Sequence, residues 1–292
     1  MPAANPAAGG TAGDPSGSPT FQQGAKYRTL HCPQTCSSGT RIATWKLGRA
    51  LTRGVVPRGV LCTICMRGSS KGVKNKNIIN INGKPLLYYT ISKAIKSKIF
   101  DEIVASSDSK KILSLSKKYG VTNIIKRPKI LSNDKSGKVP AIKHALLKIQ
   151  KLLDKKFDYV IDLDVTCPLR SILDIKKAFN HFIKSKSDNL VSATYSRKSP
   201  YFNIIQKKKN KIELIKKQNI NILRRQDVPT TYDLNASIYI WKSEALIKNP
   251  SIFQKKTSIY LMPKLKSFDI DDVVDLKITK LFLKKKNEKK NF

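Results

Sequence analysis

A short loop of small and cationic residues follows the first long apolar run of the chain. It consists of Arg67, Gly68, Ser69, Ser70, Lys71 and Gly72. Small residues allow backbone N–H groups to approach phosphate oxygens, and Arg67 and Lys71 supply opposite charge. The spacing of a Walker loop is missing. Because Lys74 and Lys76 follow in the same segment, we predict a polyphosphate site; on spacing alone, an ordinary polar loop between strand and helix remains the alternative.

Two pairs of carboxylates could hold a cation beside that loop. Asp162 and Asp164 are separated by one residue in an apolar run, and Asp269 and Asp271 repeat this spacing. In a strand, residues i and i+2 share a face, and two buried carboxylates on one face need cations to balance them. Mg²⁺ takes oxygen ligands and bridges to substrate phosphates. The pairs therefore predict a Mg²⁺ site, with helix capping or surface charge as the alternative.

The cysteines and histidines are weaker candidates. Cys32-x3-Cys36 and Cys62-x2-Cys65 loosely resemble a four-thiolate zinc site. However, Cys62 and Cys65 fall in one predicted strand, where residues i and i+3 point to opposite faces. The three histidines show neither metal nor triad spacing. We therefore favour the oxygen-ligand site over zinc.

Strands and helices must alternate to position these residues. Short apolar runs predict strands at residues 60–66, 78–81, 102–106, 121–125, 158–165 and 189–194. Helical spacing of apolar residues predicts helices at residues 85–95, 110–119, 139–153 and 172–183. Strands alternating with helices indicate an α/β fold with a mainly parallel sheet covered on both faces. In such folds the functional site lies beyond the carboxyl ends of the strands.

The alternation breaks between residues 200 and 240. Residues 202–206 and 211–215 predict a hairpin, followed by strands at 235–241 and 258–261 and a closing helix at 272–283. A non-alternating excursion inside an α/β domain is often a lid or a subunit contact. The Lys-rich residues 284–292 are expected to form a solvated basic tail.

Composition limits the class of protein. The 292 residues include 57 Lys and Arg against 20 Asp and Glu, a net charge of +37. The lysines are scattered through the chain after residue 70, so we expect solvated surface lysines rather than a nucleic-acid interface. The sequence contains no run of 18 or more apolar residues and therefore predicts no membrane span. Its five cysteines are too few for a disulfide scaffold. These features predict a cytoplasmic globular protein.

Residues 1–58 differ from the rest. They hold 8 of the 14 glycines and 6 of the 14 prolines, with a single acid, Asp14. Such a segment buries too little apolar surface to offset its ordering entropy. We predict a disordered low-complexity appendage, with a transit peptide as the alternative.

Several stretches, in this order, together resemble the acylneuraminate cytidylyltransferases (CMP-sialic acid synthetases). The matching stretches are residues 66–77 with 82–86, Arg127-Pro128 with Leu131 and Asp134, residues 166–170, Arg225-Gln226 with Pro229 and Asn235, and Asp269-Ile270-Asp271. The resemblance covers about residues 60–283, and only the conjunction of the motifs makes it specific.

The resemblance implies a fold and a reaction. The fold is the three-layer α/β/α, Rossmann-like fold of nucleotide-diphospho-sugar transferases, formed here by residues 59–283. The hairpin excursion, about residues 199–234, would lie at a homodimer contact and beside the sugar. In the reaction, CTP and a nonulosonic acid, an acidic nine-carbon sugar, give the CMP-sugar and pyrophosphate.

The resemblance also implies roles for individual residues. Those expected to bind CTP are Arg67, Gly68, Ser69, Ser70, Lys71, Lys76, Asn77 and Arg127. Of these, Arg67, Lys71 and Lys76 would be catalytic through the charge that they place on the phosphates. The residues expected to face the sugar are Tyr201, Arg225, Gln226 and Asn235. The expected Mg²⁺ ligands are Asp164, Asp269 and Asp271.

Two positions depart from the pattern of the family. Ser69 replaces the usual second glycine of the loop, a strain of about 1 kcal/mol if that position needs a positive φ. Asp164 stands where many relatives have Gln, and resembles an acidic position of the CMP-Kdo synthetases. Legionaminic or pseudaminic acid is therefore an open alternative to sialic acid. A Kdo-type acceptor, another nucleotide, or an impaired protein that binds nucleotides or polyanions also stay open.

Overall fold

The computed structural model describes residues 59–70, 72–133, 136–216, 224 and 227–288. The predicted appendage at residues 1–58 lies outside this part of the chain, and so do the last four residues. Three predicted site residues, Lys71, Arg225 and Gln226, also lie outside it.

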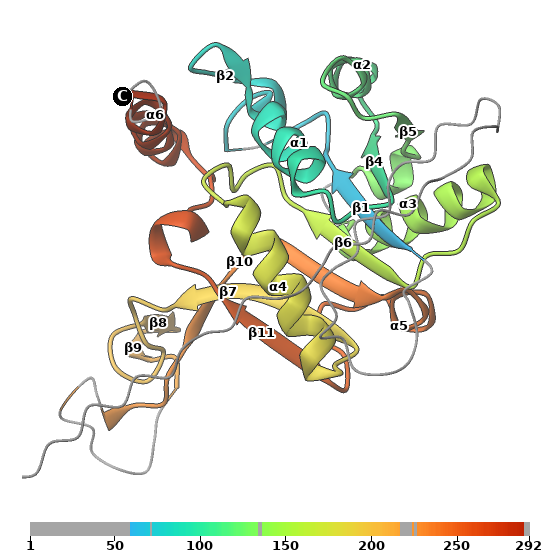
Figure 1. Ribbon diagram of the computed structural model, residues 1–292. Coiled ribbons are helices and arrows are strands. Elements are labelled where there is room, and N and C mark those ends of the chain that lie inside the picture. The colour runs from blue at the N-terminus through green and yellow to red at the C-terminus, as the bar shows by residue number, and fades with distance from the viewer. Residues whose placement is uncertain (1–58, 71, 134–135, 217–223, 225–226, 289–292) are drawn as a thin grey trace, which may run out of the picture. The chain divides into compact units, whose positions relative to one another are not determined.

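A seven-stranded sheet runs through the described domain (Figure 1). In spatial order its strands are β11 (Thr257–Leu261), β7 (Asn189–Tyr195), β10 (Tyr232–Lys242), β6 (Tyr159–Leu163), β1 (Val60–Cys65), β4 (Glu102–Ser107) and β5 (Asn123–Lys126). Strand β10 is antiparallel to both its neighbours, and every other pairing is parallel. The prediction of a mainly parallel sheet is confirmed.

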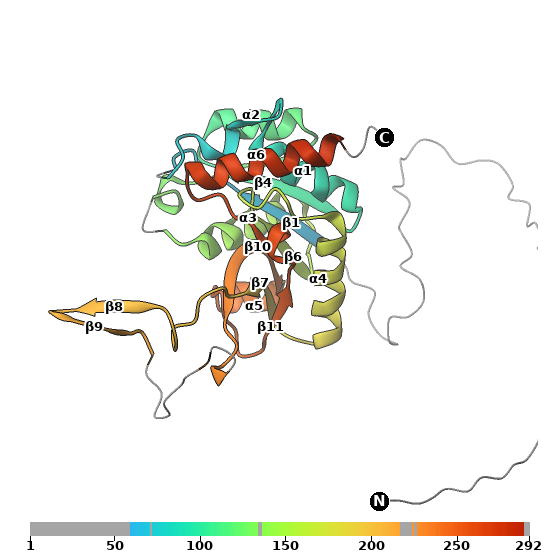
Figure 2. The same cartoon turned by 90° about the vertical axis from the view of Figure 1, so that its left-hand side faces the viewer.

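Helices cover both faces of this sheet, as Figures 1 and 2 show. One face packs against α1 (Leu86–Ser97), α2 (Lys110–Lys118) and α4 (Ile172–Ser185), and the other against α3 (Lys138–Leu153) and α5 (Ser243–Lys248). Strand alternation divides the core: Cys62 and Ile64 of β1 face the first layer, and Leu61 faces the second. The predicted three-layer α/β/α fold is confirmed.

Local signals in the sequence begin and end several helices. The Ser109 side chain accepts a hydrogen bond from the Ile112 N–H at the start of α2, and Gly120 follows this helix with a φ of 97°. Ser171 and Asp174 form a capping box at the start of α4. These helices therefore begin close to where the sequence predicts.

Shorter elements connect the larger ones. Strands β2 (Asn80–Ile81) and β3 (Lys84–Pro85) form a tight hairpin, whose turn residues Asn82 and Gly83 both have positive φ angles. The 3₁₀ turns with described bounds are η1 (Lys76–Ile78), η2 (Lys129–Leu131) and η4 (Lys264–Ser267). Residues 78–81, predicted as a strand, are thus divided between η1 and β2.

The predicted hairpin excursion is present and projects away from the main sheet (Figure 2). Its strands, β8 (Ile205–Lys208) and β9 (Lys211–Leu214), form a sheet of their own. Ile205 and Ile212 in it are 62% and 71% exposed.

The closing helix α6 (Val273–Glu288) is longer than predicted. Residues 284–288, predicted as part of a basic tail, continue the helix. Lys is a good helix former, and Leu276, Thr279 and Leu283 bury one side of the helix, so the helix extends beyond its last apolar residue.

Candidate active site

The cationic loop leaves the carboxyl end of β1 and is held by its own side chains. The Gly68 N–H donates to Asp108 Oδ1 at 2.8 Å, and the Asn77 amide donates to the Arg67 carbonyl at 2.8 Å. Ser70 Oγ donates to the Val73 carbonyl at 2.5 Å and accepts from a backbone N–H at 3.1 Å. These bonds give the loop a defined shape before any substrate binds.

Ser69 is exposed at the tip of this loop and does not have a positive φ. The described loop residue with a positive φ is Asn75, at 55°, and Asn tolerates this conformation well. The backbone strain that a positive φ would cause at Ser69 is therefore absent.

The segment that follows the cationic loop lies beside residues 269–271, called here the carboxylate segment. Lys76 Nζ donates to the Ile270 carbonyl at 2.5 Å and lies 3.5 Å from Asp271 Oδ1. A Cβ at position 72 would overlap the Asp271 carbonyl oxygen, so only glycine allows this close approach. Residues almost 200 positions apart in sequence thus meet beyond the carboxyl end of the sheet.

Asp269 is the carboxylate of this segment that points inward. The neighbouring Ile270 N–H donates to the Thr166 carbonyl at 3.1 Å, which ties the segment to the loop after β6. Asp269 Oδ1 is buried and finds no hydrogen-bond partner among the described residues. Burial and the nearby charge of Asp164 raise the pKa of Asp269 to about 6. A buried carboxylate oxygen beside a second carboxylate is a suitable ligand for a cation.

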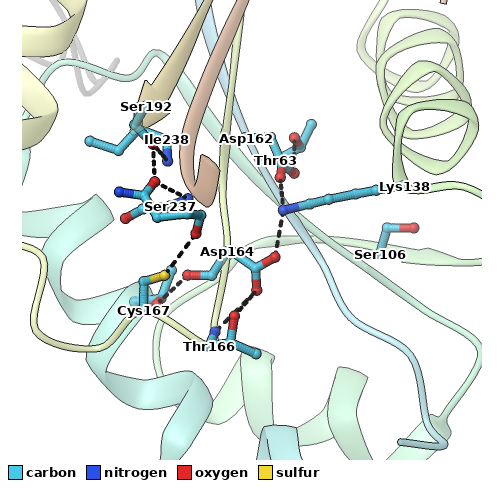
Figure 3. A network of polar contacts seen from close by, with 12 residues as sticks. Thr63, Ser106, Lys138, Asp162, Asp164, Thr166, Cys167, Ser192, Ser237 and Ile238 are labelled. Atoms are coloured by element: carbon cyan, nitrogen blue, oxygen red, sulfur yellow. Dashed lines mark hydrogen bonds and ion pairs between the residues drawn. The ribbon is translucent and has the colours of Figure 1, made fainter. Parts of the chain in front are cut away.

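A lysine that the sequence analysis overlooked lies between the two other carboxylates (Figure 3). Lys138 Nζ is 2.7 Å from Asp162 Oδ2 and 2.6 Å from Asp164 Oδ2. Asp162 is fully buried, and its Oδ1 accepts a bond from Thr63 Oγ1 at 2.8 Å. Asp164 Oδ1 accepts from both the backbone N–H and the hydroxyl of Thr166 at 3.0 Å. The prediction that both carboxylates share a face is confirmed, and the cation between them in the structure is Lys138. The predicted binding of Mg²⁺ by Asp164 stays a prediction.

These contacts set the charges of the network. Burial acts to raise the pKa of Asp164, but Lys138 and the bonds from Thr166 outweigh it and lower the pKa to about 2. Burial acts to lower the pKa of Lys138, and the two carboxylates outweigh it and raise this pKa. At neutral pH, Asp164 is therefore ionised and Lys138 protonated.

The predicted CTP-binding arginines follow β1 and β5, which lie on either side of β4 in the sheet. Arg127 follows β5 and is only 5% exposed; its Nη2 donates to the Ser106 carbonyl at 2.8 Å. Arg67 Nη1 donates to the Asn133 carbonyl at 3.4 Å. Both guanidinium groups thus have protein partners at the edge where the nucleotide is expected, and their roles toward CTP stay predictions.

On the expected sugar side, Asn235 is buried and its amide is fully used by the protein. Its Oδ1 accepts from Ser192 Oγ at 2.6 Å and from the Ser237 N–H at 3.1 Å, while its Nδ2 donates to Ser267 Oγ. Figure 3 shows Ser192 and Ser237 in this arrangement, next to Cys167. Asn235 therefore supports the wall of the site from within, and its predicted contact with the sugar is not tested by this geometry.

Tyr201 lies at the start of the excursion, where its ring is 5.8 Å from Lys216 Nζ. Residues 195–199 and 228–231 run side by side at the base of the excursion, and a cleft of about 180 Å³ opens between them. Tyr201 does not line this cleft.

Arg170 has a structural role that the motif did not reveal. Its side chain is completely buried and donates to the carbonyl and hydroxyl of Ser237, the hydroxyl of Thr90 and the carbonyl of Asp164. The guanidinium therefore holds the backbone at Asp164, where the loop after β6 begins.

Among the described residues, no group of three or more His, Cys, Asp or Glu side chains is arranged to hold a metal ion. The zinc alternative has no support there either, since Cys62 is buried in the core and the other half of the motif, Cys32 and Cys36, lies outside the described residues. Helices long and apolar enough to cross a membrane do not occur in the described part of the chain.

Sequence relatives cover nearly all of the described domain. A family profile described as Cytidylyltransferase matches residues 61–291. The post-translational flagellin modification protein B of Campylobacter coli and the CMP-N,N'-diacetyllegionaminic acid synthase of Campylobacter jejuni are each 44% identical to this chain. In both cases the match spans 228 residues, which are 78% of this chain and 96% of the relative. A pseudaminic acid cytidylyltransferase of C. jejuni is 32% identical over 228 residues, 78% of this chain and 97% of that protein.

Solved structures share the fold at low sequence identity. A CMP:2-keto-3-deoxy-manno-octonic acid synthetase complexed with CTP matches 78% of this chain and 99% of its own, with 12% identity and a TM-score of 0.55. A 4-diphosphocytidyl-2C-methyl-D-erythritol synthase matches 78% of this chain and 100% of its own, with 9% identity and a TM-score of 0.57. These likenesses support the fold alone. The family profile and the sequence relatives confirm the resemblance stated from the motifs, and they show that this chain belongs to the cytidylyltransferase family, in the group of CMP-nonulosonic acid synthetases.

Proposed function

We propose that this chain is a Mg²⁺-dependent cytidylyltransferase that transfers CMP from CTP to a nonulosonic acid and releases pyrophosphate. One observation carries the proposal: Lys76, which follows the cationic loop at the start of η1, contacts the Ile270 carbonyl and Asp271, beyond the carboxyl ends of the strands. Cations for a triphosphate and carboxylates for a divalent ion thereby meet in one place. The relatives named for CMP-nonulosonic acid synthesis support the reaction class.

The reaction depends on positioning and charge. The anomeric hydroxyl of the sugar attacks the α-phosphorus of CTP in line and gives up its proton to water. A new P–O bond forms, and the bond to pyrophosphate breaks. The transition state spreads negative charge over the phosphate oxygens, so fixed cations stabilise it. Arg67, Lys71 and Lys76 supply this charge from the loop, whose internal hydrogen bonds fix Ser70 and Asn77 before CTP arrives.

Asp164 and Asp269 are the proposed ligands of Mg²⁺, with Asp271 at the surface beside them. The buried Oδ1 of Asp269, which has no hydrogen-bond partner among the described residues, fits a cation, and so does the repulsion between the Asp269 and Asp164 carboxylates. When bound, Mg²⁺ would neutralise phosphate charge. The protein holds the site ready, because Thr166 and Lys138 fix the Asp164 carboxylate.

The acceptor that we propose is an acidic nine-carbon sugar of the legionaminic type. The support is the 44% identity to a relative named CMP-N,N'-diacetyllegionaminic acid synthase, against 32% for the one named for pseudaminic acid. Tyr201, Arg225, Gln226 and Asn235 remain the residues proposed for the sugar side.

Two copies of the chain associate, we propose, through the hairpin excursion, in the cytoplasm where CTP is available. A two-stranded hairpin is only marginally stable by itself, and Ile205 and Ile212 expose apolar surface on it. A second copy would cover these side chains. Light scattering coupled to size-exclusion chromatography should give the mass of a dimer, and the Ile212→Lys variant should shift it toward the monomer.

The test of the proposed activity is pyrophosphate release. It should require CTP, Mg²⁺ and a nonulosonic acid together, with diacetyllegionaminic acid preferred in a panel that also contains pseudaminic, sialic and eight-carbon Kdo-type acids. Competition by UTP or GTP in the same assay defines the nucleotide. If none of the acids in the panel supports pyrophosphate release, the proposal is refuted. Activity with the Kdo-type acid alone would move the acceptor to that class.

A further inference from the structure

Lys138 occupies a position that helix formation does not explain. It is the first residue of α3, whose first turn contains no acidic side chain. A cation at a helix N-terminus is opposed by the helix dipole. The ammonium nevertheless points back to the sheet, where it contacts Asp162 and Asp164 at 2.7 and 2.6 Å (Figure 3). Its side chain keeps 23% exposure, so solvent reaches part of it.

The Lys138 ammonium helps to fix the orientation of the Asp164 carboxylate. Asp164 Oδ2 contacts Lys138, and Oδ1 is held by two bonds from Thr166. Asp162, fully buried, contacts the same ammonium and is itself fixed by Thr63. Both oxygens of Asp164 are thus fixed, while Asp269 Oδ1, close to the Thr166 loop, has no partner among the described residues.

We propose that Lys138 is a positioning residue that acts as an internal cation: it holds Asp164 in place and restricts the divalent ion to the side of Asp269. This inference rests on the proposed function, in which Asp164 and Asp269 bind the ion. An ammonium this close to both carboxylates repels any divalent cation that approaches them on the α3 side. Asp164 and Asp269 are therefore left to bind a single ion from the side away from α3.

The experiment measures Mn²⁺, as a stand-in for Mg²⁺, bound to the full chain without nucleotide, by electron paramagnetic resonance of the free ion at pH 8. A unit charge about 6 Å from a divalent ion changes its affinity by about tenfold even at the dielectric constant of water, about 80, and by more inside the protein. Lys138→Met should therefore bind Mn²⁺ at least about tenfold more tightly than the wild type. An affinity unchanged from the wild type would overturn the proposal.

A matched control comes from the same helix. Lys143 is also partly buried, but its Nζ donates to the Ile247 carbonyl at 2.6 Å and forms no ion pair among the described residues. Lys143→Met removes one positive charge away from the carboxylates and should leave Mn²⁺ affinity within about twofold, since distant charges are screened. If both variants tighten binding equally, net charge explains the effect and the proposal fails.

Two further variants keep the test decisive if Lys138→Met folds poorly. Asp162→Asn retains Lys138 but removes a carboxylate, and should weaken Mn²⁺ binding by about threefold or more. The double variant Lys138→Met/Asp162→Asn should restore an affinity close to the wild type. Wild-type binding in Asp162→Asn, or no restoration in the double variant, would contradict the role assigned to Lys138.

Kinetics separate this role from a purely structural one. With CTP and a nonulosonic acid, Lys138→Met should lower kcat by about tenfold or more through misplaced metal and leave KM for CTP within about threefold. Equal changes in both parameters would contradict it. Because the Mn²⁺ comparison needs no turnover, an inactive wild type would refute the proposed function and leave this inference to be judged by binding alone.

Discussion

Replacing Asp269 by Asn is expected to stabilise the metal-free protein while it abolishes turnover. Asp269 Oδ1 is buried without a partner among the described residues, and burial together with the charge of Asp164 raises its pKa to about 6. Above that pH the folded protein holds a carboxylate whose burial and repulsion by Asp164 outweigh the help of Thr166 and Lys76, and the unfolded chain releases it to water. Asn has nearly the same shape and no charge, so the substitution removes the cost and also removes the proposed metal ligand.

The size of the effect follows from the pKa. The rise from 3.8 to about 6 corresponds to about 3 kcal/mol, at about 1.36 kcal/mol per pKa unit. The folded protein binds the proton more tightly than the unfolded chain, so the wild type loses stability as the pH rises from about 4 to 6 and then levels off. Since Asp269 retains some solvent contact, we expect Asp269→Asn to gain about 2 kcal/mol at pH 8 and less than about 1 kcal/mol at pH 4.

Urea denaturation followed by circular dichroism, with EDTA present, measures this difference at both pH values. Asp271→Asn is the matched control, because the Asp271 side chain is 81% exposed and its substitution should change stability by less than about 0.5 kcal/mol. Pyrophosphate release by Asp269→Asn should fall by about 10²-fold or more. The reasoning is refuted if Asp269→Asn is no more stable than the wild type at pH 8, or if its gain is the same at pH 4.

Three other substitutions test the geometry of the site. Gly72→Ala should lower kcat/KM for CTP by about tenfold or more, because its Cβ would overlap the Asp271 carbonyl oxygen; steady-state kinetics with the wild-type value would contradict the close approach. Arg170→Met should lower the free energy of unfolding by about 3–5 kcal/mol, since four buried acceptors lose their donor; urea denaturation measures this, and a loss below about 1 kcal/mol would speak against it. Lys76→Gln should reduce kcat by about 10²–10³-fold with an unchanged circular dichroism spectrum, and nearly normal turnover would remove Lys76 from the mechanism.

Most of the fold could be predicted from the sequence, because its elements carry strong local signals. The continuous apolar run before Arg67 predicts a strand buried on both faces, and β1 is one. The alternation of strands with amphipathic helices predicts the three layers. What failed was the end of α6, where residues 284–288 were expected in a tail, because Lys favours both a solvated tail and an exposed helical turn.

The site was predictable in its acidic and cationic segments and less so in their partners. The i, i+2 spacing of Asp162 and Asp164 correctly predicted that the two carboxylates share a face and need a cation. It did not say that the cation is Lys138, one of many lysines in a Lys-rich chain. The sequence did contain one indication. Lys138 is the first residue of a helix, where the helix dipole disfavours a positive charge, so a nearby anion is expected to stabilise it.

The types and spacing of residues determined the alternating layers, the family and the two charged segments of the site, because periodicity, turn chemistry and local charge are properties of neighbouring residues. Which atoms of those segments meet was decided only by the tertiary structure. Lys76 reaches Asp271, and Lys138 pairs with Asp162 and Asp164. The Asn235 amide forms its hydrogen bonds within the core. These contacts form because parallel strands from distant parts of the chain end at one edge of the sheet. Contacts across that edge depend on strand order and register, and no pattern along the sequence encodes these directly.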